Sequence, residues 1–259
     1  MSWWGKVVGG GFGFMLGGPL GAIMGAALGH HFDKGLSNLE SIGVGDQQRT
    51  QAAFFTATFS IMGFLAKVDG HVSKDEIAMA QHVMAQMNLS AEQKKAAIAL
   101  FNEGKASDFP LNKVLQQFRM ECHRRTSLLR MFMEILISTA MADGVLHAEE
   151  SKVISSIGQQ LGFDKHYIDQ LLNMINAQYK FNDRPQKNAS SSISDAYAVL
   201  GVDKHISDAE LKKTYRRLMS QHHPDKLVSK GLPEEMISLA NEKTHEIKSA
   251  YELIRQSRK

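Results

Sequence analysis

The tripeptide His223-Pro224-Asp225 divides the C-terminal part of the chain into two arms. The arm before it, about residues 209–221, follows Ser207-Asp208-Ala209-Glu210, a capping box in which serine and glutamate side chains each satisfy a free backbone N–H. Pro224 has no amide proton and disfavours a helical conformation at His223, so the first helix must end there. The second arm, about residues 234–255, restarts after Pro233. This pattern predicts a helical hairpin whose loop contains the tripeptide.

Each arm has one apolar side at helical spacing. In the first arm this side is formed by Leu211, Tyr215 and Leu218, and in the second by Ala240, Thr244, Ile247, Tyr251 and Ile254. The opposite side of the first arm carries four cations: Lys212, Lys213, Arg216 and Arg217. Because the apolar sides can close on each other, we expect the basic side and the bend to face solvent.

A short apolar piece, Tyr197-Ala198-Val199-Leu200-Gly201-Val202, precedes the hairpin. In this order and spacing, residues 193–259 resemble a J domain, the module by which DnaJ-type co-chaperones engage DnaK-type ATPase chaperones. The resemblance implies that this chain performs no chemistry and holds no cofactor, because the partner binds and hydrolyses ATP. It also implies which residues dock on that partner: Lys212, Lys213, Tyr215, Arg216, Arg217, His223, Pro224 and Asp225.

The N-terminus contains 23 residues without a charge, Val7 to Gly29. As a helix they would extend roughly 34 Å, enough to cross a hydrocarbon core of about 30 Å. We therefore predict an uncleaved, single-pass transmembrane anchor over residues 1–35, in contact with membrane lipid. The alternative is a glycine-rich tail outside the membrane, since glycine and Pro19 lower helicity.

Glycines recur at every fourth position of this segment, which places them on one helical stripe: Gly9, Gly13, Gly17, Gly21 and Gly25. Such a stripe lets two helices approach closely in lipid, so we expect a homodimer through the anchor. Flanking charges do not decide the orientation. The J-domain resemblance implies a bacterial inner membrane with the short N-terminus periplasmic and the C-terminal bulk cytoplasmic, because DnaK-type chaperones and ATP are cytosolic.

After a polar connector (36–50), residues 51–180 read as a helical domain with an internal repeat. Residues 66–70, with Asp69, align 74 residues later with residues 140–144, with Asp143. Each copy predicts a buried helix, an Asp-Gly turn and an amphipathic helix. The region resembles the TerB-like domain associated with tellurite-resistance proteins, a family in which acidic clusters have suggested metal binding. The corresponding candidates here are Asp69, Asp75, Glu76, Asp143, Glu149 and Glu150.

Turn formation and pairing with helix dipoles explain the same acidic residues without a metal, and we favour that interpretation, with a protein-interaction platform as the default role. Residues 181–192 contain Asn, Pro and a run of serines, which predicts a flexible linker. The net charge of +3 is slight, and a single cysteine excludes an internal disulfide. The chain as a whole is therefore predicted to be all-α.

Taken in order, an anchor, a TerB-like domain and a J domain resemble the membrane-anchored DnaJ-like co-chaperones of Gram-negative bacteria. The resemblance implies a regulatory co-chaperone rather than an enzyme. Two alternatives stay open: a metal-responsive membrane sensor that uses the acidic repeat, and nucleic-acid binding by the basic arm. The basic side of that arm lacks interleaved aromatic residues, so we expect no nucleic-acid partner.

Overall fold

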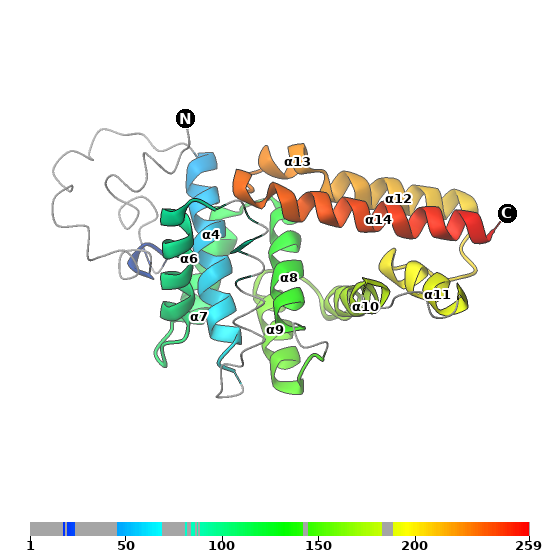
Figure 1. Ribbon diagram of the computed structural model, residues 1–259. Coiled ribbons are helices and arrows are strands. Elements are labelled where there is room, and N and C mark those ends of the chain that lie inside the picture. Colours follow the sequence, from blue (N-terminus) through cyan, green and yellow to red (C-terminus); the bar gives the residue numbers. More distant parts are fainter. Residues whose placement is uncertain are drawn as a thin grey trace.

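The computed structural model describes residues 46–68, 89–141, 145–182 and 189–258, together with isolated positions within 18–23 and 81–87. Within 179–192 it describes only the backbone of two helix ends. These residues form helices and no strand, which confirms the all-α prediction (Figure 1). The helices are α4 (Asp46–Leu65), α6 (Ala91–Gly104), α7 (Leu111–Glu121), α8 (Thr126–Ala140), α9 (Ala148–Gln160), α10 (Lys165–Asn182), α11 (Ala189–Val199), α12 (Asp208–His222), α13 (Pro224–Val228), the 3-10 turn η3 (Glu234–Met236) and α14 (Ile237–Ser257).

Helices α4 and α8 form the centre of a bundle that we call the body, α4 to α9. Both are buried on nearly every side, as the repeat predicts. The aromatic rings of Phe54, Phe118 and Phe132 pack together between α4, α7 and α8, with centroids 4.6 to 6.2 Å apart. The positions that the repeat pairs are all buried: Phe55, Phe59, Met62 and Leu65 in α4, and Leu129, Met133, Leu136 and Thr139 in α8.

The predicted hairpin is present, with α12 and α14 side by side (Figure 1). The end of the hairpin that lies away from the body shares a core with α11. This core contains Leu211, Leu218, Ile247 and Ile254. Two details differ from the sequence prediction. The loop contains a turn of helix, α13, because Pro224 suits a first helical position. The second arm begins as the 3-10 turn η3, and the α-helix starts only at residue 237.

The flexible linker predicted over residues 181–192 needs correction. Helix α10 continues to Asn182 and α11 begins at Ala189, so the segment is helical at both ends, while residues 183–188 lie outside the described residues. The physical reason is burial further along α11. Ile193 and Ala196 pack in the hairpin core, and a helix held there can extend backwards through serines that have little preference of their own.

The other end of the hairpin, which contains α13, η3 and the start of α14, docks on the body. Four of its apolar residues belong to the body core rather than to the hairpin core: Leu227, Leu232, Met236 and Ala240. Polar contacts surround them, including Gln93 Nε2 to Glu235 Oε1 at 2.6 Å and Lys230 Nζ to Ser127 Oγ at 3.0 Å. Gly231, with φ of 102°, lies so close to α4 that a Cβ there would be 2.9 Å from Thr50 Cγ2. The hairpin is therefore seated on the body.

A buried ionic junction joins the two parts. Glu134 of α8 and His222 of α12 are 4% and 3% exposed. Both ring nitrogens of His222 face oxygen atoms: Nε2 lies 2.9 and 3.1 Å from the Glu134 carboxylate oxygens, and Nδ1 lies 2.9 Å from the Leu218 carbonyl oxygen. Lys243 Nζ of α14 lies 3.8 Å from Glu134 Oε2.

The charges around Glu134 determine its ionisation. Burial alone would raise the pKa of this carboxyl group. The positive charges of His222, Lys243 and Arg130, together with the hydrogen bond from His222, outweigh burial and lower the pKa to about 2. Arg130 also stacks over the Tyr167 ring at 5.1 Å and donates to Gln221, the residue before His222. Glu134 is therefore the shared counter-ion of three cations.

Most of the predicted anchor lies outside the described residues, including Gly9, Gly13, Gly17 and Gly25. Gly21 lies in a short helical stretch, residues 20–23, and is buried. Leu20 packs against the body core, and its N–H donates to Gln117 Oε1 of α7 at 2.8 Å. Within the part of the chain that is described, no helix has the length and hydropathy needed to span a membrane.

We predict that Glu134→Gln lowers the free energy of unfolding by about 3 kcal/mol or more, because removing one member of a buried ion pair leaves its cations uncompensated. Thermal unfolding of the full-length protein in detergent would measure this. Glu149→Gln is the matched control, since Glu149 and Lys152 form an exposed pair at 2.7 Å whose loss should cost less than about 1 kcal/mol. Equal effects of the two substitutions would contradict the junction.

The lowered pKa of Glu134 also predicts a pH dependence. The group is ionised in the folded protein down to about pH 2 but becomes protonated in the unfolded chain near pH 4.5. Its contribution, on the order of 3 kcal/mol, is complete above pH 4.5 and disappears as the pH falls towards 2. The stability difference between wild type and Glu134→Gln should therefore shrink over this range. A difference that stays constant between pH 6 and pH 3 would argue against the assignment.

Candidate docking site at the His-Pro-Asp bend

The bend is short and locally fixed. His223 is extended, with φ of −60° and ψ of 124°, and it ends α12 and caps α13 at once. The Asp225 N–H donates to His223 Nδ1 at 3.2 Å, which leaves Nε2 as the protonated nitrogen of the neutral ring. Pro224 occupies the first position of α13. The bend therefore has one backbone conformation that a partner can meet without further ordering.

Exposed and buried groups alternate across the bend. The side chains of His223 and Asp225 are 49% and 91% exposed. The residues that flank them are fixed, since His222 is buried against Glu134 and Leu227 lies in the body core. Lys226 Nζ donates to Ser220 Oγ at 2.5 Å and so links α13 back to α12. Two polar groups are thus presented to solvent from a rigid support.

The four cations of α12, which we call the basic face, lie at the surface: Lys212, Lys213, Arg216 and Arg217 are all exposed. None of their side chains makes a hydrogen bond or ion pair with another described residue. Tyr215 differs from them, because it is partly buried and stacks on Tyr251 of α14 at 4.1 Å between ring centroids. The structure therefore gives Tyr215 a role in holding the two arms together, beside any role in docking.

Sequence reasoning missed two contributors to this site. Lys226 is exposed immediately after the tripeptide and extends the positive charge from the basic face to the bend. Its position directly after the tripeptide could have identified it as part of the site. Glu134 fixes the bend from below, but it lies 88 positions away from His222 in a largely apolar helix. No local pattern links the two residues.

The acidic candidates for a metal site divide into two groups. Asp69, Asp75, Glu76 and Asp143 lie outside the described residues. Glu149 pairs with Lys152, and Glu150 accepts the His147 N–H at 3.0 Å at the start of α9. Among the residues that the structure describes, no three His, Cys, Asp or Glu side chains are grouped to hold a metal ion. The two described carboxylates act in helix capping and surface pairing.

Comparison with known families divides the chain into three parts in the predicted order. Residues 1–39 match the family model of the co-chaperone DjlA transmembrane domain. Residues 55–173 match that of the tellurite resistance protein TerB, and residues 195–259 match the DnaJ domain. No solved structure matches the chain.

Curated relatives extend this similarity over the full length. The co-chaperone protein DjlA of Photobacterium profundum is 40% identical over 98% of this chain and 99% of its own. The proteins of the same name from Vibrio cholerae and Coxiella burnetii are 42% and 43% identical over 100% of this chain and 99% of theirs. Identity at this level over the whole length confirms the resemblance drawn from the motifs: the chain belongs to the DjlA family of co-chaperones.

Proposed function

We propose that this protein is a membrane-anchored regulatory co-chaperone that binds a DnaK-type chaperone through its hairpin and stimulates the ATPase activity of that chaperone. One observation carries the proposal. The His223-Pro224-Asp225 bend and the basic face are exposed, while the residues directly behind them are held by buried contacts. A surface that is both accessible and pre-ordered loses little entropy when a partner docks on it.

The basic face supplies attraction. Four unpaired cations within two turns of α12 produce a positive potential that accelerates encounter with an acidic surface. On contact, arginine can form charge-assisted, bidentate hydrogen bonds with carboxylates. The J-domain resemblance points to acidic surface on the ATPase domain of the partner. Electrostatic attraction therefore sets the rate and orientation of binding.

The bend supplies the coupling. His223 and Asp225 offer a ring nitrogen and a carboxylate on a backbone that Pro224 restricts. Such groups can bind one conformation of a partner better than another and so shift its equilibrium towards hydrolysis. No nucleophile or base is needed on this side, because the nucleotide belongs to the partner. The chain accordingly acts on another protein's chemistry.

The anchor fixes where this happens. The match of residues 1–39 to a transmembrane domain supports attachment to the membrane. Because DnaK-type chaperones and ATP are cytosolic, we place the C-terminal bulk in the cytoplasm, the short N-terminus in the periplasm and the anchor across the inner membrane. The glycine stripe supports pairing of two anchors. The TerB-like body, on which the hairpin is seated, then serves to select clients or to receive a signal.

We predict that His223→Gln abolishes stimulation of DnaK ATPase turnover while the protein stays folded, because His223 is half exposed and supports only the short helix α13. Steady-state ATP hydrolysis by DnaK with the reconstituted full-length protein would measure this. His245→Gln is the control, since His245 is also exposed but lies on α14 away from the bend. Stimulation that survives His223→Gln would refute the proposal.

A second prediction concerns salt. Lys213→Ala combined with Arg216→Ala should weaken DnaK binding about tenfold at low ionic strength, and the difference from wild type should shrink as salt is raised and the charges are screened. Binding kinetics at several salt concentrations would show the loss mainly in the association rate. Lys248→Ala removes an exposed cation of α14 and serves as the control. A loss that is independent of salt would argue against electrostatic steering.

A further inference from the structure

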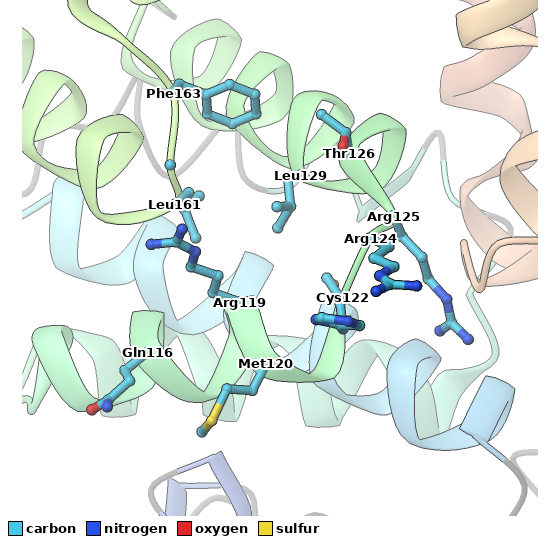
Figure 2. Close-up of a pocket in the computed structure, with 12 residues that line it drawn as sticks. Gln116, Arg119, Met120, Cys122, Arg124, Arg125, Thr126, Leu129, Leu161 and Phe163 are labelled. Carbon is cyan, nitrogen blue, oxygen red and sulfur yellow. The ribbon is translucent and has the colours of Figure 1, made fainter.

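A second group of basic side chains lines a pocket on the body, where α7 turns into α8 (Figure 2). The cavity measures about 450 Å³. Three arginines and one histidine contribute to its lining, Arg119, His123, Arg124 and Arg125, and no acidic side chain does. A concave surface that carries charge of one sign concentrates ligands of the opposite sign. The pocket therefore favours an anion.

The basic side chains of this pocket differ in whether they already make hydrogen bonds within the protein. Arg119 donates to the Gln160 carbonyl at 3.0 Å, and Arg125 donates to the Thr50 hydroxyl. His123 and Arg124 are exposed, and the side chain of neither makes a hydrogen bond or ion pair with another residue that the structure describes. Arg119 and Arg125 are thus held in place by contacts within the protein, and the side chains of His123 and Arg124 remain available to a ligand.

Arg124 has an unusual backbone. Its φ is 59°, and no other described residue except glycine has a backbone in the left-handed region. That conformation costs roughly 1 kcal/mol for a residue other than glycine, asparagine or aspartate. Arginine thus occupies a turn position at which glycine would be less strained. In Figure 2, Arg119 and Arg124 lie on either side of Leu129.

The pocket also has an apolar part. Leu129 and Leu161 are 8% and 3% exposed and form its inner wall with Phe163. Met120 of α7 also lines the pocket and is 62% exposed. A ligand that fits both parts carries an anionic group beside a hydrocarbon region.

The location of the pocket indicates the source of such a ligand. Arg49 in the first turn of α4 pairs with Glu121 at 2.8 Å, and Arg125 contacts Thr50, so the rim is attached to the start of α4. Only residues 40–45 separate α4 from the segment that matches the transmembrane domain. From residue 35, the end of the predicted anchor, to Asp46 at the start of α4, eleven peptide steps reach about 40 Å at most.

We propose that this pocket binds the phosphate-bearing head group of an anionic phospholipid, with the apolar wall against the adjoining hydrocarbon. The inference rests on the membrane anchor of the proposed function. Arginine side chains match phosphate oxygens in geometry as well as charge. The anchor tethers the pocket near a high local concentration of lipid head groups, and an anionic membrane surface attracts basic groups that come within about one Debye length of it.

The test uses the full-length protein in nanodiscs of phosphatidylcholine with increasing phosphatidylglycerol. A polarity-sensitive fluorophore is attached at Gln116→Cys on the pocket edge, where labelling is selective because the native Cys122 is buried. Emission should shift to shorter wavelength as phosphatidylglycerol is added. Arg124→Asn, which tolerates the left-handed backbone, should raise the phosphatidylglycerol fraction needed for half the shift about fivefold.

Two further variants separate charge from structure. Arg124→Lys keeps the charge but loses the bidentate geometry, so the phosphatidylglycerol fraction it needs should lie between those of wild type and Arg124→Asn, whereas Lys95→Asn removes an exposed cation of α6 and should change nothing. Equal emission in the two lipids would overturn the proposal. So would an equal shift on adding inorganic phosphate or poly-glutamate to phosphatidylcholine nanodiscs, which would assign the pocket to a dissolved anion or an acidic peptide. Loss of the protein from every nanodisc would instead overturn the anchor, and the lipid site with it.

Discussion

The arrangement of this protein depends on the contact between Glu134 and His222. Glu134 is buried in the central helix α8 of the body, and His222 lies one residue before the tripeptide that the hairpin presents. Because Glu134 also faces Lys243, one carboxylate contacts both arms of the hairpin. The apolar contacts at the end of the hairpin that docks on the body supply burial, which has no direction of its own. The ionic junction defines where on the body the hairpin stands and which way the bend faces.

An apolar junction of the same volume would cost less desolvation. A carboxylate that needs His222 and Lys243 at the same time is satisfied in one register only, whereas leucine side chains tolerate sliding. We infer that the ionic junction is less stabilising than an apolar junction would be, but that it defines the position of His223. This matters because His223 and Asp225 make few contacts with the rest of the protein. Their positions are therefore fixed by the buried residues on either side of them, His222 and Leu227.

Much of the fold could be predicted from sequence because its signals are local. The Ser207 cap, the stop at Pro224 and the two apolar stripes define the hairpin within about fifty residues, and the repeat identifies α4 and α8 as central helices. Contacts between distant segments gave no such signal. Glu134 looked like one charge in an apolar helix. Residues 189–192 looked like a linker because they are rich in serine, but they are helical because α11 is held by burial further along. The seating of the hairpin on the body followed from neither pattern.

The position of the bend also bears on where a partner would be held. Gln47 in the first turn of α4 donates to the Val228 carbonyl at the end of α13 at 3.3 Å. Helix α13 and the start of α4 therefore lie at the same end of the body (Figure 1). The chain enters the body from the matched transmembrane domain at that end, through residues 40–45. A chaperone docked on the bend would then stand close to the membrane, and a lipid held in the basic pocket would restrict the body to the same orientation. The tether and the docking surface would act together, since the hairpin has a fixed seat.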